Sequence, residues 1–200
     1  MHREQIFGES LFFIHDFFSP EECDRSIAFS EGRVYEDATI TTGDGFLRVK
    51  GMRNNMRVMV DSQVLAARLF ERARPFLPPR VDFWHLHGLN ERFRYYRYDV
   101  GQTFKPHYDG SFCRNAGEES QLTLMVYLND DFTGGTTDFY NEDETPRASV
   151  KPRRGMALVF VHQQLHEGAP VTHGRKYVLR TDVMYRVIPA KAEVQVGGVR

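Results

Sequence analysis

The chain has 200 residues, of which 41% are hydrophobic and 13% aromatic, and its formal net charge at pH 7 is −1. This length and composition are typical of one domain with a sizeable buried core, which excludes an intrinsically disordered protein. The near-neutral charge excludes a strong electrostatic attraction to nucleic acid or to an anionic membrane.

The first predicted elements are a strand and a helix. Residues 11–14 (LFFI) are all apolar and predict a short buried strand. Ser19 is followed at once by Pro20, and Glu22 lies three residues after the serine. This pattern predicts a helix that begins with a serine N-cap, a proline in the first position and a capping box.

A polar stretch and a second helix follow. Residues 34–57 have no clear period, so we expect a loop with short strands. Leu65, Leu69 and Ala73 then recur at helical spacing. The second helix is expected over residues 61–75, because proline at its end cannot continue a helix.

Beyond Pro79 the hydrophobic period changes from helical to alternating. We expect strands over residues 83–87, 93–98, 122–128, 156–161 and 177–185. Short strands separated by turns are typical of a β-sandwich or barrel, including the jelly roll. The prediction is a mainly β (α+β) fold in one domain over residues 1–200, with a helical N-terminal layer over about 1–80 packed on a β core over about 81–190.

The sequence gives no sign of membrane attachment or secretion. No apolar run approaches the ~18 residues of a membrane span, and the N-terminal residues lack a signal-peptide pattern. The two cysteines, Cys23 and Cys113, are far apart and outside any metal-binding or redox motif. We therefore expect a cytoplasmic protein with reduced thiols and no membrane partner.

His107, Asp109 and His166 form the candidate metal site. Alternate side chains of a strand share one face, so His107 and Asp109 point the same way. His166 lies five residues after the apolar run 157–161, where a core strand ends. Two imidazoles and one carboxylate can form the facial triad of non-haem Fe(II) oxygenases. Lys176 lies ten residues beyond His166 and is expected to return to the same cavity.

A second histidine pattern competes with this site. His85, His87 and Glu91 resemble half of the cupin motif H-x-H-x3-E. The flanking glycines of that motif are missing, because Pro79 and Tyr98 stand in their places. We interpret His85 and His87 as strand residues with satisfied hydrogen bonds.

Five motifs run in one order over roughly residues 92–186. They are Y-x-x-G-Q-x-F-x-P-H-Y-D (98–109), L-x-L-M-V-Y-L-N-D (122–130), G-G-T-T (134–137), K-P-x-x-G-x-A-L-V-F (151–160) and H-E-G-x-P-V-x-x-G-x-K-Y (166–177). Together they resemble the prolyl 4-hydroxylase-like branch of the Fe(II)/2-oxoglutarate oxygenases. The resemblance implies a double-stranded β-helix core. It also implies a dioxygenase that hydroxylates a C–H bond of a protein, with proline among the candidates, or of a small molecule, and releases succinate and CO2.

The resemblance assigns roles to particular residues. It implies iron ligation, and hence catalysis, by His107, Asp109 and His166. Lys176 would pair with the C5 carboxylate of 2-oxoglutarate, a charge-assisted contact suited to a partly dry pocket. Tyr98 stands where the family has a tyrosine hydrogen-bonded to that carboxylate. The implied cofactors are Fe(II), 2-oxoglutarate and O2, with ascorbate as a further candidate.

Two more residues belong to the implied 2-oxoglutarate site. Thr137 is a candidate contact. Arg180 lies four residues past Lys176 and shares its strand face. With Arg186 it resembles the R-x5-R arrangement of nucleic-acid-demethylating relatives, in which the first arginine binds 2-oxoglutarate. Lys176 is the first choice of anchor and Arg180 the alternative.

The chain departs from its relatives where they bind substrate. Ser120 stands where collagen-type and algal enzymes have a substrate-contacting arginine, Asp182 where they have a tryptophan, and Phe104 where a tyrosine is common. Proline is therefore one candidate target among protein side chains and small molecules. Polar residues 36–51 and 111–120 are lid candidates, and Arg53 with its two following asparagines is a candidate substrate contact.

Two other classes of function are alternatives to an oxygenase that acts on a protein or a small molecule. A cupin-like binding module without turnover would use the same roll for a ligand. A nucleic-acid dealkylase would need a basic groove, which the net charge does not favour. The sequence does not indicate the oligomeric state.

Overall fold

The computed structural model describes residues 1–42, 45–47, 49 and 51–188. Its large sheet runs in the order β1 (His2–Phe7), β2 (Leu11–His15), β16 (Ala157–Val161), β12 (Glu118–Tyr127), β19 (Lys176–Val187), β9 (Arg92–Tyr98), β6 (Met56–Asp61), β3 (Glu36–Asp37). Off this path, β8 (Trp84–Leu89) pairs with β19 and β7 (Arg80–Val81), and β11 (Cys113–Asn115) pairs with β12.

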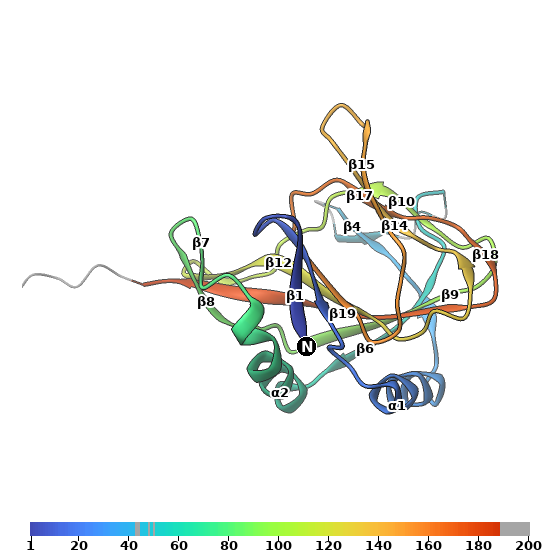
Figure 1. Ribbon diagram of the computed structural model, residues 1–200, viewed down its shortest axis with the longest axis horizontal. Coiled ribbons are helices and arrows are strands. Elements are labelled where there is room, and N and C mark those ends of the chain that lie inside the picture. The colour runs from blue at the N-terminus through green and yellow to red at the C-terminus, as the bar shows by residue number, and fades with distance from the viewer. Residues whose placement is uncertain (43–44, 48, 50, 189–200) are drawn as a thin grey trace, which may run out of the picture.

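A small sheet lies across one face of the large one (Figure 1). Its order is β10 (Phe104–His107), β17 (His166–Gly168), β14 (Thr137–Tyr140), β15 (Pro146–Val150). Two further pairs are β13 (Thr133–Gly134) with β18 (Val171–His173), and β4 (Ile40–Thr42) with β5 (Gly45–Leu47). Two antiparallel sheets packed face to face form the predicted jelly roll.

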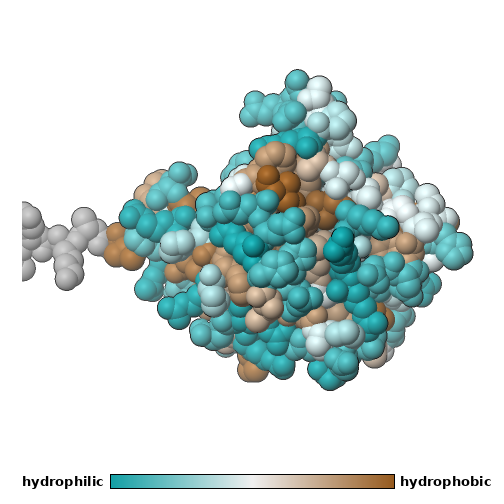
Figure 2. Space-filling view, viewed as in Figure 1, coloured by the Kyte–Doolittle hydropathy of each residue, from teal (hydrophilic) through white to brown (hydrophobic). Residues whose placement is uncertain are grey.

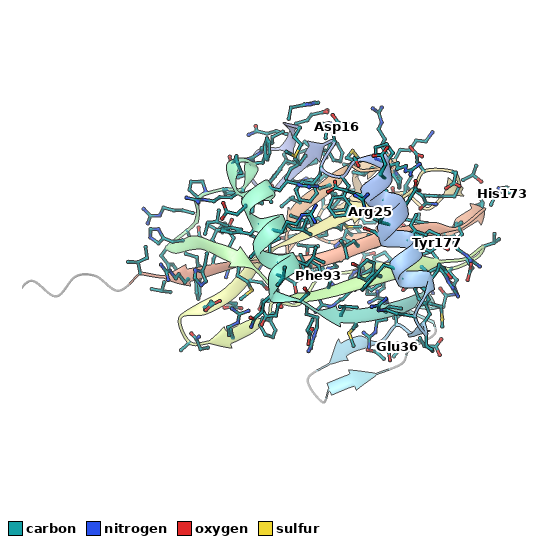
Figure 3. The ribbon with its side chains drawn as sticks, turned by 90° about the horizontal axis from the view of Figure 1, so that it is seen from below. Asp16, Arg25, Glu36, Phe93, His173 and Tyr177 are labelled. Carbon is teal, nitrogen blue, oxygen red and sulfur yellow. The ribbon has the colours of Figure 1, made fainter. Side chains whose placement is uncertain are left out.

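Helices α1 (Pro20–Glu31) and α2 (Gln63–Ala73), with the 3₁₀ turn η1 (Arg74–Phe76), cover the other face of the large sheet (Figures 1 and 3). The predicted capping box is present at Ser19 and Glu22, and Ser62 caps α2. Glu22 also accepts two 2.7 Å hydrogen bonds from Arg72 of α2. The guanidinium holds the pKa of Glu22 at about 2, so this ion pair joins the two helices at neutral pH.

The large sheet is buried on both faces, which explains its continuous apolar runs. In β19, Leu179 belongs to the apolar cluster under the helices, while its neighbour Val178 belongs to the cluster between the two sheets. Phe139 of β14 and Phe160 of β16 meet in that second cluster, with ring centroids 5.3 Å apart. The small sheet is therefore held on the large one by aromatic packing beside the predicted site.

The predicted elements agree with the structure except at a few places. The strands over 11–14, 83–87, 93–98, 122–128, 156–161 and 177–185 correspond to β2, β8, β9, β12, β16 and β19. The strand expected to carry His107 corresponds to β10, which ends at His107, so Asp109 lies beyond it. Strands β1, β14, β15, β17 and β18 were not predicted, because short strands with polar residues carry little periodic signal. The lid candidate 111–120 is mostly a hairpin of β11 and β12, and part of the other, 36–51, lies outside the described residues.

The N-terminal eighty residues contribute strands as well as helices. β1, β2 and β6 all belong to the large sheet, alongside strands from the C-terminal part. Among the helices of the described residues, none is long and apolar enough to cross a membrane.

Candidate metal centre

The pairing of two short strands brings the two predicted histidines together. β10 runs antiparallel to β17, and His107 lies directly opposite His166 in this register. Opposed residues on antiparallel strands project from the same face. The two imidazole centroids are accordingly 4.3 Å apart. The 57 residues that separate Asp109 from His166 in the sequence therefore do not separate them in space.

Asp109 completes the cluster from the segment that follows β10. Its backbone N–H donates to the His162 carbonyl over 3.2 Å. Its two carboxylate oxygens lie 3.7 Å from Nε2 of His107 and 3.8 Å from Nε2 of His166. One ligating atom from each of the three residues lies within 4.8 Å of the others. Two imidazole nitrogens and one carboxylate oxygen in this arrangement match the donor set of Fe(II) oxygenases.

Backbone carbonyls orient both histidines. Nδ1 of His107 is 2.7 Å from the carbonyl oxygen of Lys105, and Nδ1 of His166 is 2.9 Å from that of Gln164. A carbonyl can only accept, so Nδ1 carries the proton in each ring and Nε2 presents its lone pair to the cluster. The sequence could not indicate these partners, because any residue type supplies a carbonyl.

Burial of the two histidines and the charge of Arg180 beside Asp109 keep the three groups in the protonation states that bind a metal. Desolvation, followed by the nearby His166, lowers the pKa of His107 to about 3. Desolvation likewise lowers the pKa of His166. Burial opposes the ionisation of Asp109, but the charge of Arg180, with the two histidines, outweighs it and holds the pKa of the carboxyl well below its ordinary value.

A buried chain of hydrogen bonds supports Asp109 from behind. The Thr123 hydroxyl donates to Oδ2 of Asp109 over 2.6 Å and lies 3.1 Å from Nδ1 of His162. Oγ of Ser120 lies 2.9 Å from Nε2 of His162 and accepts from the Phe112 N–H over 2.8 Å. Burial lowers the pKa of His162. With His162 neutral and protonated on Nδ1, every donor in this series of hydrogen bonds has one acceptor.

Arg180 forms ion pairs with two carboxylates. Its guanidinium lies 3.1 Å from Oδ1 of Asp109 and 3.2 Å from Oδ1 of Asp182. Asp182 also pairs with Arg94 over 3.2 Å. Ser120 and Asp182 are two of the three positions at which the chain departs from its relatives, and both are internal: Ser120 is 0% and Asp182 2% exposed.

Lys176 is buried in the lining of the same cavity. It is 2% exposed, and its Nζ donates to the Gly135 carbonyl over 2.7 Å. Within the described part of the chain it forms no ion pair. Burial lowers the pKa of its amine to about 7. Gly135 has a φ of +63°, and a Cβ there would lie 3.2 Å from Cδ of Lys176, so glycine is required for this contact.

One cavity is lined by all seven predicted site residues, namely His107, Asp109, His166, Lys176, Tyr98, Thr137 and Arg180. Tyr98 and Tyr127 place their ring centroids 5.4 Å from the Lys176 amine. The Thr137 hydroxyl is 2.7 Å from that of Tyr127. The structure thus brings the predicted metal ligands and the predicted carboxylate anchor into a single space.

Arg53 is a further cation of this cavity. Its guanidinium lies 4.5 Å from the Tyr96 ring centroid and 4.2 Å from that of Phe104, and its Nε donates to Asn55. Arg53 is 5% exposed, and Nη2 makes no hydrogen bond to a described residue. The described lining thus combines the cations Arg53, Lys176 and Arg180 with one carboxylate. This balance suits a dianionic ligand.

The competing histidine pattern does not form a cluster. His85 lies opposite Arg186 in the pairing of β8 and β19, and Nε2 of His87 lies 3.8 Å from Glu118. His85, His87 and Glu91 do not meet as a metal-ligating group among the described residues. The interpretation of His85 and His87 as strand residues agrees with this placement.

Comparison with known sequences identifies the relatives of this chain. The profile of the 2OG-Fe(II) oxygenase superfamily matches residues 93–181. The chain is 30% identical to a PKHD-type hydroxylase of Paracoccus denitrificans, over 84% of this chain and 74% of that protein. It is 28% identical to a probable prolyl 4-hydroxylase 3 of Arabidopsis thaliana, over 83% of this chain but only 66% of the plant protein's length.

Solved structures resemble the fold over most of its length. A viral collagen prolyl hydroxylase from Paramecium Bursaria Chlorella virus-1, in complex with 2-oxoglutarate, has a TM-score of 0.61 at 25% identity and covers 90% of this chain and 98% of its own. A prolyl hydroxylase from Trichoplax adhaerens, in complex with a hypoxia inducible factor peptide fragment, has a TM-score of 0.68 at 16% identity, covering 91% and 86%. The second likeness concerns the fold alone.

The chain belongs to the 2OG-Fe(II) oxygenase superfamily. Within it, the relatives place the chain in the prolyl 4-hydroxylase-like branch, as the sequence predicted. The jelly roll is the double-stranded β-helix of these enzymes. The cofactors of the family are Fe(II), 2-oxoglutarate and O2, and the His–Asp–His cluster fits the first of them.

Proposed function

We propose that the protein hydroxylates a C–H bond of a peptide substrate, with peptidyl proline as the first candidate, using Fe(II), 2-oxoglutarate and O2. The observation that carries this proposal is the cavity itself. Its lining includes both the set of His107, Asp109 and His166 and the buried Lys176, which forms no ion pair with a described residue. A ligand that binds the metal through one carboxylate and carries a second carboxylate suits this combination of groups.

We assign the metal to His107, Asp109 and His166. Bound Fe(II) would supply the redox chemistry in which a C–H bond, 2-oxoglutarate and O2 become an alcohol, succinate and CO2. The protein's part is to present two neutral imidazoles and one carboxylate on one face, so that three coordination positions stay open. The carbonyls of Lys105 and Gln164 fix the rings, while Thr123 and Arg180 fix the carboxylate.

We assign the C5 carboxylate of 2-oxoglutarate to Lys176, with Tyr98 and Thr137 beside it. Lys176 is preferred to Arg180 because Arg180 is already paired with Asp109 and Asp182. A buried amine with only a carbonyl partner gains a charge-assisted hydrogen bond when a carboxylate arrives. In this assignment Arg180 holds the iron ligand and does not anchor the cosubstrate.

Substrate recognition would differ from that of the collagen-type enzymes. Ser120 and Asp182 are fully engaged inside the protein, so neither can contact a peptide. Arg53 also lines the cavity, where its guanidinium contacts the rings of Tyr96 and Phe104 and its Nη2 has no hydrogen-bond partner among the described residues. We assign it to a carbonyl group of the substrate. A peptide is favoured because relatives named prolyl 4-hydroxylase or prolyl hydroxylase recur in sequence and in structure.

The two thiols support a proposal about the cellular setting. Cys23 and Cys113 are both unpaired, the first buried and the second exposed. Free thiols are typical of a reducing compartment, and we therefore assign the protein to the cytoplasm.

An anaerobic titration of the Fe(II)-loaded protein with 2-oxoglutarate, followed by visible absorption, tests the proposal. We expect a weak charge-transfer band in the wild type and none in His107→Ala. Iron bound without a band would contradict the assigned cosubstrate site. Succinate release is then measured with proline-containing peptides against the same peptides with alanine in place of proline. Equal succinate release with the proline-containing and the alanine-containing peptides would reject proline as the target.

A further inference from the structure

The N-terminal hairpin carries a second group of metal-ligating side chains, on a different sheet from His107 and His166. His2 lies directly opposite His15 in the antiparallel pairing of β1 and β2, and Glu4 follows His2 by two residues. Opposed residues, and residues two apart on one strand, share a face of the sheet. The three side chains therefore project from the same face of the hairpin.

The distances within this group are those of a nearly formed site. The rings of His2 and His15 stack with centroids 4.4 Å apart and an interplanar angle of 15°. A carboxylate oxygen of Glu4 lies 2.6 Å from Nε2 of His15. One ligating atom from each residue lies within 4.8 Å of the others. Ligands 2.0–2.2 Å from a tetrahedral ion are roughly 3.3 Å apart, so small side-chain rotations would close the group around one ion.

We propose that His2, Glu4 and His15 form a surface site for a divalent transition-metal ion of the Zn²⁺ type, with water completing the coordination. Two imidazoles and a carboxylate favour Zn²⁺, Ni²⁺ or Cu²⁺ over Mg²⁺ and Ca²⁺, which require oxygen ligands. The side chain of Glu4 is 59% exposed and that of His15 is 16% exposed, so the ion reaches the site directly from solvent.

The bound ion would stabilise the edge of the large sheet. β1 is the terminal strand and pairs with β2, which in turn pairs with β16. An ion shared by His2 of β1 and His15 of β2 therefore joins the edge strand to the sheet. A ligand that binds only the folded hairpin raises the free energy of unfolding by RT ln(1 + L/Kd), where L is the free ligand concentration.

Isothermal titration with Zn²⁺ tests the site in the full chain. The reference is the His107→Ala/His166→Ala variant, in which the cavity no longer competes for metal. We expect the reference to bind one Zn²⁺ per chain. Adding His2→Ala/His15→Ala to the reference should weaken Zn²⁺ binding at least hundred-fold. Adding Glu4→Gln instead should weaken it about ten-fold. The matched control adds His173→Ala, an exposed histidine on β18 at another part of the surface, and should bind as the reference does (Figure 3).

Thermal unfolding with and without Zn²⁺ provides the second readout. The reference and the His173 control should gain the same rise in unfolding temperature, and the His2→Ala/His15→Ala variant should gain none. Unchanged Zn²⁺ affinity without the two hairpin histidines would overturn the proposal. So would a reference that binds no Zn²⁺, because the group would then be only an ion pair between Glu4 and His15. Neither outcome bears on the oxygenase site, which the reference variant lacks.

Discussion

The cavity and the N-terminal hairpin each carry two histidines and one carboxylate, in different surroundings. In the cavity, Asp109 has a 6% exposed side chain and is held by Thr123 and Arg180. On the hairpin, the carboxylate of Glu4 is 59% exposed and bonds to His15. The face that carries the hairpin is largely hydrophilic (Figure 2). Two histidines and a carboxylate are therefore not what distinguishes a catalytic centre.

The difference lies in burial and in supporting contacts. Burial of His107 and His166 lowers their pKa values, and backbone carbonyls fix their orientation. Partners of this kind typically account for 10–100-fold in metal affinity. The cavity also contains Lys176, which has no counterpart in the hairpin group. The variants below separate these contributions.

The largest effect is expected from Asp109→Asn. The substitution removes the negative charge that balances Arg180 and the metal ion, so Fe(II) affinity should fall by more than the ~100-fold typical of supporting partners. Turnover should become undetectable. Metal titration and succinate release measure both quantities. The hairpin control, Glu4→Gln, should keep full turnover, and a loss of activity there would contradict the separation of the two regions.

Lys176→Ala should come next. Removing one partner of a buried charge pair costs about 2–5 kcal/mol, so KM for 2-oxoglutarate should rise roughly 30-fold or more. Fe(II) affinity should stay close to that of the wild type, since Lys176 touches none of the metal ligands. Lys176→Arg should recover part of the loss. An unchanged KM in Lys176→Ala together with a raised KM in Arg180→Lys would instead favour Arg180 as the anchor.

The cosubstrate affinity should depend on pH through Lys176. Burial lowers the pKa of its amine to about 7, so below pH 7 the cation is already present, and above it binding of a carboxylate must take up a proton. Affinity should then fall by up to about ten-fold per pH unit above 7. Calorimetry at pH 8 in two buffers of different ionisation enthalpy measures the proton uptake. Lys176→Arg should remove the dependence.

The buried chain behind Asp109 should have a smaller effect. Thr123→Val removes the hydroxyl that donates to Asp109 and leaves His162 without its acceptor, so Fe(II) affinity should fall about 10-fold. Thr123→Ser, which restores the hydroxyl, should bind as the wild type does. A Co²⁺ absorption spectrum reports the ligand geometry independently of turnover. If Thr123→Val had the same Co²⁺ spectrum and Fe(II) affinity as the wild type, the hydrogen bonds behind Asp109 would have only a structural role.

The smallest effect is expected on the hairpin without metal. Glu4→Gln removes a largely exposed ion-paired carboxylate, which typically contributes ~1 kcal/mol or less. The unfolding temperature should therefore fall by at most about 2–4 °C, measured by circular dichroism. A larger loss would mean that Glu4 supports the hairpin as strongly as Thr123 and Arg180 support the cavity.

Much of the site could be read from residue spacing. The H-x-D pattern and the position of Lys176 relative to His166 predicted residues that line the cavity. Strand alternation was not the whole reason, because β10 ends at His107 and Asp109 lies in the segment that follows it. The helix caps at Ser19 and Ser62 were equally readable, since capping depends on neighbouring residues. These features are local, and local features depend little on the rest of the chain.

Tertiary structure decided what depends on distant segments. The pairing of β10 with β17, the carbonyls that orient His107 and His166, and the commitment of Arg180 to Asp109 and Asp182 follow from strand register, which no short motif encodes. The same holds for the hairpin group, in which a turn brings His15 opposite His2. Sequence thus determined the chemical groups, and the packing of the sheets decided which of them are buried, oriented and charged.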